Sequence, residues 1–231
     1  MFLLLFIVII MWCTMKTKRK VMGVGINDAE YVVVKFEVVE GKRKQVWICP
    51  YYQTWKTMLK RCFYEKDLQI RPNYREVSVC DSWLHFSCFK SWMEEQVWYT
   101  DGGKLHMDKD ILVPDSKIYS PETCKFVPCY INSLFTLRGN HRGQFPLGVV
   151  EQGGKYVASV TNKLFNRYLG IYSTPEEAHR AWQLGKAEVI KLTVEKYRTE
   201  PFYTAEVERA LQNRIDLLLS DHTLNVETKA L

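Results

Sequence analysis

Residues 144–193 carry the pattern that most constrains the fold of this chain. Two short β-rich runs, Leu147–Glu151 and Lys155–Thr161, are separated by Gln152–Gly154, a glycine-containing turn of the kind that joins the strands of a hairpin. A third β-rich run, Arg167–Tyr172, follows a polar loop. The second run alternates apolar and polar residues, as a strand with one buried face does. The segment therefore predicts a three-stranded antiparallel sheet.

A helix is predicted directly after the third strand. Thr174 is a good helix-capping residue, Pro175 suits the first helical position, and Glu177 completes a capping box with Thr174. Small and apolar residues then recur at helical spacing and would let the helix lie close on one face of the sheet. They are Ala178, Ala181, Trp182, Gly185 and Val189. The expected architecture is an α+β fold in which the sheet packs on one helix.

The rest of the chain mixes strands and helices. Tyr31–Val39 and Gln45–Ile48 are β-rich and flank a turn, so they predict an N-terminal hairpin. An amphipathic helix is expected over 51–64, and a second helix is expected to begin at Asp81 as its cap and to run to about residue 97. Thr204 would cap a last helix, which would pack on the core or pair with another chain. One face of that helix would carry Val207, Leu211, Ile215 and Leu218.

Composition fits an ordinary globular protein with an anionic partner. Hydrophobic residues make up 47% of the chain and charged residues 25%, and the net charge is +6. A basic balance suits nucleic acid but is weak support for it. The seven cysteines have no Cys-x-x-Cys spacing, so we interpret them as reduced thiols in a cytoplasmic protein. A zinc site at Cys49 and Cys62, or at Cys80 and Cys88, lacks the usual spacing.

The first residues stand apart from the rest. Met1–Trp12 is almost wholly apolar, but as a helix it spans roughly 18 Å, short of the roughly 30 Å hydrocarbon core. Its basic residues follow the apolar run, whereas a secretory signal carries them before it. We expect a mis-assigned start, with Met15 as the alternative, and no stable membrane association; a membrane anchor is the minority interpretation. The expected divisions are 1–14, 15–137, 138–195 and 196–231.

The sheet face away from the predicted helix has the character of a nucleic-acid surface. It carries short polar side chains and Lys155, while Lys163, Arg167 and Arg142 lie at its margins. A narrow sheet can enter the major groove of B-form DNA, and flanking cations would neutralise phosphates. The alternative is a solvated sheet face in a structural α+β domain.

Five short segments of this unit resemble one family. They are Phe145–Val149, Lys155–Val160, Tyr168–Tyr172, Ser173–Ala178 and Ala181–Trp182, and together they resemble the APETALA2/ethylene-response-factor DNA-binding domain. In that family the three-stranded sheet lies in the major groove of double-stranded DNA. The resemblance implies that eight positions face DNA here: Leu147, Val150, Gln152, Lys155, Ser159, Thr161, Asn166 and Tyr168.

The chain departs from that family at several of these positions. Most members place arginine or tryptophan there, whereas Lys155 and Tyr168 keep that character here. A bidentate contact between arginine and guanine provides about 1–3 kcal/mol of discrimination. The resemblance thus implies DNA binding with a sequence preference that is weak or different from that of the family.

The middle of the chain resembles a second family in outline. Met107–Asp110, Tyr119–Cys124 and Asn132 are similar to the histidine-bearing strand, the Asn-x-Pro-Glu-Asn loop and the final asparagine of HNH endonucleases. The combination resembles phage-encoded homing endonucleases that carry an appended DNA-binding domain. It implies metal-dependent cleavage of DNA phosphodiester bonds, with no small-molecule substrate. In that family a histidine activates water and Asp, His or Asn side chains hold one divalent metal.

The catalytic positions of that family are altered in this chain. Asp108 stands where the histidine would fall, and His106, two residues earlier, would be the base if the register shifts. Asp108 and Asp110 would ligate Mg²⁺, which prefers carboxylate oxygens. Asn132 completes the candidate site. The alternative is an inactive DNA-binding or transcription-regulator-like protein, in which Asp108 and Asp110 hold a turn through side-chain to backbone hydrogen bonds.

Overall fold

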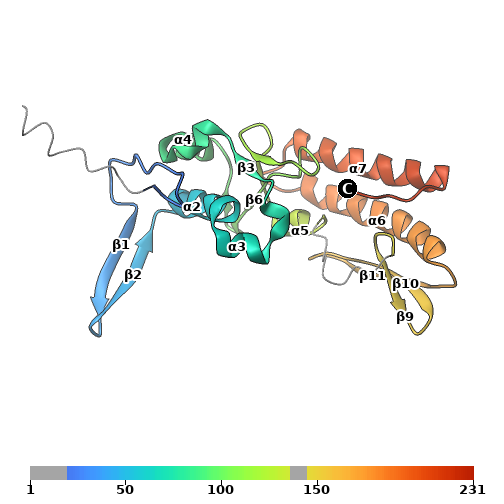
Figure 1. Cartoon of the computed structure of the whole chain (residues 1–231). Helices are drawn as coiled ribbons and strands as arrows, with labels where there is room; N and C mark the ends of the chain where they lie inside the picture. The colour runs from blue at the N-terminus through green and yellow to red at the C-terminus, as the bar shows by residue number, and fades with distance from the viewer. Residues whose placement is uncertain (1–19, 136–144) are drawn as a thin grey trace, which may run out of the picture. The chain divides into compact units, whose positions relative to one another are not determined.

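The computed structural model describes residues 20–135 and 145–231, which form two compact units (Figure 1). The first unit contains the described residues up to Glu95 together with Lys117–Ser120, and the second contains Gln96–Ser116 and Pro121–Leu231. The segment expected over 15–137 is therefore shared between the two units. The apolar residues 1–14 and the expected boundary at residue 138 lie outside the described residues. Within the described ranges, no helix is long and apolar enough to cross a membrane.

The first unit begins with the predicted hairpin and helix, which are both confirmed. Strands β1 (Val34–Val39) and β2 (Lys42–Ile48) pair antiparallel, and α2 (Pro50–Phe63) follows with proline in its first turn. Trp55, Met58 and Leu59 of α2 are fully buried. The remaining short elements are α3 (Glu65–Ile70), a 3₁₀ turn (Pro72–Tyr74), and β3 (Ser78–Val79), which pairs parallel with β7 (Ile118–Tyr119).

The predicted start of the second helix at Asp81 is wrong. Asp81–Leu84 forms a 3₁₀ turn, His85 is extended, and α4 (Phe86–Glu94) begins after it. The N-terminus of α4 is capped by Asp28, whose carboxylate accepts hydrogen bonds from the backbone N–H and the hydroxyl of Ser87 at 2.8 and 2.7 Å. Asp28 lies 59 residues away from Ser87 in the sequence, so local pattern does not reveal this cap.

The predicted sheet and helix of the second unit are confirmed. Strands β9 (Val149–Gln152), β10 (Lys155–Thr161) and β11 (Asn166–Tyr172) form an antiparallel sheet in the order β11-β10-β9. The sheet packs on α6 (Pro175–Arg198). The capping box is present, since Thr174 Oγ1 accepts from the Glu177 N–H and Glu177 Oε2 accepts from the Thr174 N–H, each at 3.2 Å.

The last helix, α7 (Ala205–Leu224), packs against α6 of the same chain. Its stripe of Val207, Leu211, Ile215 and Leu218 is buried in the core that α6 and the sheet share. Of the two predicted roles for this helix, packing on the core is therefore the one observed.

Residues 96–116 and 121–135, here called the middle segment, contribute to this same core. The middle segment contains β4 (Tyr99–Thr100) and β5 (Gly103–Lys104), which form a small hairpin. Strand β6 (His106–Asp108) pairs antiparallel with β8 (Lys125–Val127), and α5 (Cys129–Asn132) follows. Ile111, Val127 and Ile131 belong to the hydrophobic cluster that also holds the sheet and α6. The middle segment and the sheet are thus parts of one folded body.

Candidate nucleic-acid interface

The register of the three strands determines which side chains share the face turned away from α6. Ala158 and Val160 of β10 are buried against the helix. The residues that alternate with them, Val157, Ser159 and Thr161, therefore point to the other side. Residues directly opposite one another on paired strands project from the same face. Val157 is paired with Val150 on one side and with Ile171 on the other, so these three aliphatic residues form a row across the sheet.

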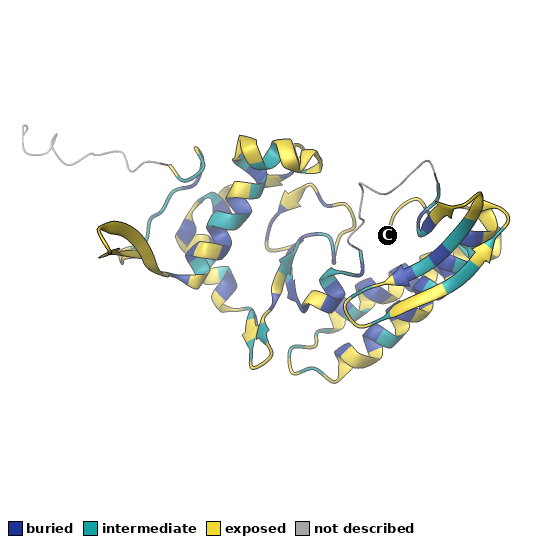
Figure 2. Cartoon of the chain, turned by 90° about the horizontal axis from the view of Figure 1, so that it is seen from below, coloured by how far each residue is buried: buried dark blue, intermediate teal, exposed yellow. Residues whose placement is uncertain are grey.

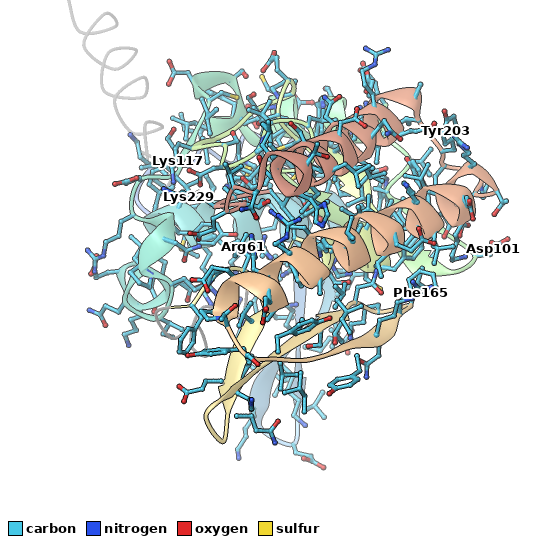
Figure 3. All side chains as sticks on the ribbon, turned by 90° about the vertical axis from the view of Figure 1, so that its right-hand side faces the viewer. Arg61, Asp101, Lys117, Phe165, Tyr203 and Lys229 are labelled. Carbon is cyan, nitrogen blue, oxygen red and sulfur yellow. The ribbon has the colours of Figure 1, made fainter. Side chains whose placement is uncertain are left out.

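We call the whole set on that side the outer sheet face. Side chains project from the sheet on the side away from α6 in Figure 3. Three apolar members are well exposed, with relative accessibilities of 54% for Val150, 65% for Tyr168 and 59% for Ile171. The full set is Val150, Gln152, Lys155, Val157, Ser159, Thr161, Asn166, Tyr168 and Ile171. It is a mixed apolar, amide and cationic surface.

Seven of the eight DNA-facing positions inferred from the family resemblance lie together on this face, and Leu147 does not. Leu147 precedes β9, is 5% exposed, and belongs to the hydrophobic core. Its carbonyl accepts a hydrogen bond from His179 Nδ1 at 2.8 Å, which ties this segment to α6. The assignment of Leu147 to the interface is therefore corrected: its side chain is a core residue.

Ile171 belongs to the outer sheet face although the sequence did not identify it. Strict alternation from Tyr168 would place Gly170 and Tyr172 outward. A bulge lets Ser159 pair with Tyr168 while Ala158 pairs with Gly170, so Leu169 is an extra residue in β11. The bulge reverses the facing of the later residues and turns Ile171 outward. A glycine within a strand was the available signal for it.

The three cations predicted at the margins of this face, Lys163, Arg167 and Arg142, do not share one location. Arg167 is exposed but pairs with Val160, so its side chain leaves the sheet on the α6 side and not on the outer sheet face. Lys163 is exposed in the loop between β10 and β11. Arg142 lies outside the described residues. Lys155 is the cation of the outer sheet face itself, opposite Gln152.

A hydrogen bond orients one amide on this face. Thr161 Oγ1 donates to Asn166 Oδ1 at 3.0 Å, across a directly paired position of β10 and β11. With Oδ1 occupied in this way, the Asn166 amide offers its N–H donors to a ligand. Such donors match the acceptors N7 and O6 on purine edges in the major groove.

The middle segment brings two of its predicted site residues together. The pairing of β6 with β8, followed by α5, places Asn132 Nδ2 3.4 Å from His106 Nδ1. His106 is exposed and Asn132 is half-buried. Strands β6 and β8 and helix α5 thus form a strand–strand–helix unit, with β7 between the two strands along the chain.

The Asp108 carboxylate stabilises a turn through hydrogen bonds to the backbone. Its Oδ1 accepts hydrogen bonds from the backbone N–H groups of Asp110 and Ile111, at 2.7 and 3.0 Å. Burial raises the pKa of Asp108 above its usual value, and these two hydrogen bonds act in the opposite direction. The side chain thus does what the structural alternative predicts: it holds the chain where β6 ends.

Asp110 is also engaged by the protein. Its carboxylate forms an ion pair with Lys109 at 2.7 Å, and its carbonyl accepts a hydrogen bond from Arg214 of α7 at 2.6 Å. Arg214 also interacts electrostatically with the carboxylates of Asp108 and Asp110, so protein cations already balance their charge. Among the described residues, no group of three or more His, Cys, Asp and Glu side chains is arranged to hold a metal ion. The Mg²⁺ site expected at Asp108 and Asp110 therefore stays a prediction, at two carboxylates that the protein itself also engages.

Comparisons with protein-family models, with curated proteins and with solved structures gave no match to this chain.

Proposed function

We propose that this chain is a DNA-binding protein whose outer sheet face lies in the major groove of double-stranded DNA. The observation that carries the proposal is the exposed, mixed surface of β9, β10 and β11, backed by α6. The B-DNA major groove is roughly 12 Å wide and admits a narrow β-structure. A sheet held rigid by a packed helix would present its side chains with little loss of entropy on binding.

The side chains of this face suit particular groups on base edges. The Gln152 amide suits N6 and N7 of adenine, the Asn166 amide offers its N–H donors to purine N7 or O6, and Lys155 suits guanine O6 and N7 or a phosphate. The exposed aliphatic Val150 and Ile171 suit the methyl group of thymine. We therefore expect a preference for sites that contain A·T pairs. Lys163 and Arg167 would contact phosphates at the rim.

Point variants of the full chain test this proposal. Lys155→Ala with Tyr168→Ala should weaken binding to a labelled 30-base-pair duplex by tenfold or more in fluorescence anisotropy, because each good base contact contributes about 1–3 kcal/mol. The matched control is Lys191→Ala with Leu184→Ala, which removes one cation and one exposed apolar side chain from α6. Equal affinities of the two double variants would overturn the proposal.

A second candidate is metal-dependent DNA cleavage by an HNH-like homing endonuclease. The observation that favours it is the strand–strand–helix unit of β6, β8 and α5, which brings His106 to Asn132. In this function the Asn132 amide would turn so that Oδ1 accepts a hydrogen bond from His106 Nδ1–H, which leaves Nε2 free to accept a proton from the attacking water. Asp108 and Asp110, which also hold the turn beside His106, would supply carboxylate oxygens to the divalent metal.

Plasmid nicking with and without Mg²⁺ separates the two candidates. The endonuclease predicts Mg²⁺-dependent nicking that is abolished by His106→Ala and by Asp108→Ala with Asp110→Ala. Absence of nicking by the wild-type protein would remove this candidate and leave the DNA-binding or transcription-regulator-like protein.

A further inference from the structure

The hairpin of β1 and β2 is exposed on both of its faces. Apart from Val34 and Ile48 at its base, every residue of the two strands is exposed (Figure 2). An isolated two-stranded ribbon is marginally stable in water. Large apolar side chains nevertheless lie on this one, with Val38 74% exposed and Trp47 42% exposed. Such a surface is typical of an element that is covered by a partner.

The tip of the hairpin is a tight two-residue turn. Glu40 and Gly41 both have positive φ, 54° and 71°, which is the geometry of a type I′ turn. The turn matches the twist of the two strands and lets the ribbon keep its pairing to the end, from Val34–Ile48 to Val39–Lys42. The hairpin is thus a narrow, preformed arm.

One face of the arm is a lysine face. Lys35 pairs with Trp47, Glu37 with Lys44 and Val39 with Lys42, so three lysines share this face with one carboxylate. The Lys35 ammonium lies 5.5 Å from the centre of the Trp47 ring. Lys44 is 3.7 Å from Glu40, but both side chains are well exposed, so this ion pair is weak.

The opposite face carries a stacked arginine. Val38 pairs with Arg43, and the Arg43 guanidinium lies 4.2 Å from the centre of the Phe36 ring. Stacking holds the guanidinium flat and reduces the entropy that it would lose on forming a bidentate hydrogen bond. Guanine O6 and N7 are the major-groove acceptors that such a fork matches.

We propose that the β1–β2 hairpin is a second DNA-binding arm, which enters the major groove with Arg43 toward the bases and its lysine face toward the phosphates. Charge complementarity selects this partner: between residues 34 and 48 there are four cations and two carboxylates. The width of a two-stranded ribbon fits the major groove, and the exposed Phe36 and Val38 would be covered by base edges. The arm lies in the first unit, so it is separate from the outer sheet face.

Salt dependence of binding by the full chain tests the lysine face. Lys35→Ala with Lys42→Ala and Lys44→Ala should make the negative slope of log K against log salt shallower by about two to three, since each phosphate contact contributes about −0.9. The control with the same net charge replaces the exposed Lys66, Lys191 and Lys229 by alanine. A slope for the arm variant as steep as that of the control would overturn the proposal.

Photo-crosslinking identifies the occupant of the arm directly. A benzoylphenylalanine placed at Val38 should crosslink to a DNA duplex, whereas the same group at Ile70, which is 79% exposed in the same unit, should not. Crosslinking of Val38 to a second copy of the chain, or association with anionic lipid vesicles in place of DNA, would overturn the proposal. Both readouts leave the outer sheet face intact, so loss of binding in Lys155→Ala with Tyr168→Ala but not in the arm variant would refute the arm alone.

Discussion

Gly148 shows how a single residue fixes the sheet on its helix. Its φ is +77°, and a Cβ atom added there would lie 1.9 Å from the Trp182 ring. Gly148→Ala should therefore destabilise the fold by about 1–3 kcal/mol through backbone strain and by a similar amount through overpacking. Gly154→Ala is the matched control, since Gly154 also has a positive φ but has nothing within 4 Å of the added atom. Thermal denaturation measures both, and equal losses would show that Trp182 does not limit this position.

Asp108 gives a prediction on pH dependence. Burial raises the pKa of this carboxyl in the folded protein, so the folded state favours the protonated form. The stability that this preference contributes is present at low pH and is lost as the pH rises from the ordinary value of 3.8 through the raised pKa. In Asp108→Asn that part of the pH dependence should disappear. Denaturant unfolding at several pH values measures it, and an unchanged profile would contradict the prediction.

Two residues show where sequence reasoning succeeded and where it did not. The alternation of β10 correctly separated Lys155 from Ala158 and Val160, because a strand with one buried face repeats every two residues. Leu147 was placed on the interface by resemblance, whereas the residue lies before the strand and faces the core. A resemblance aligns positions but does not supply the backbone direction at the end of a strand.

At the scale of elements, the capping box of α6 is the clearest local signal. Thr174→Ala removes the acceptor for the Glu177 N–H and should cost about 0.5–2 kcal/mol of stability. Ser173→Ala is the control, because it keeps the backbone N–H that donates to Glu177 Oε2. Chemical denaturation should rank Thr174→Ala as the less stable variant; the reverse order would mean that the cap does not stabilise the helix.

Elements that depend on distant residues were beyond sequence reasoning. The start of α4 is set by Asp28, and the outward turn of Ile171 is set by a bulge that depends on how β11 pairs with β10. In contrast, β1, β2, α2 and the three strands of the sheet follow from local periodicity and turn residues. The engagement of Asp108 in a turn was one of two open interpretations, and hydrogen-bond geometry supports it.

At the scale of the molecule, the sheet, the middle segment and α7 share one hydrophobic core. Leu211→Ala or Leu218→Ala should destabilise the sheet as well as the helix, by about 2–5 kcal/mol, because each side chain is fully buried. Leu217→Ala, which is 42% exposed on the same helix, should have a small effect. Hydrogen exchange of the strand amides detects the coupling, and sheet protection that is unchanged in Leu211→Ala would contradict it.

Methyl NMR of the full chain with a DNA duplex tests directly whether the outer sheet face binds DNA. If it does, the δ1 methyl resonance of Ile171 on that face shifts as the duplex is added. The control is the exposed Ile70 of α3, which belongs to neither the outer sheet face nor the arm and should not shift. A duplex that binds while the Ile171 resonance stays in place, or a duplex that does not bind, would show that this face is not a DNA-binding surface.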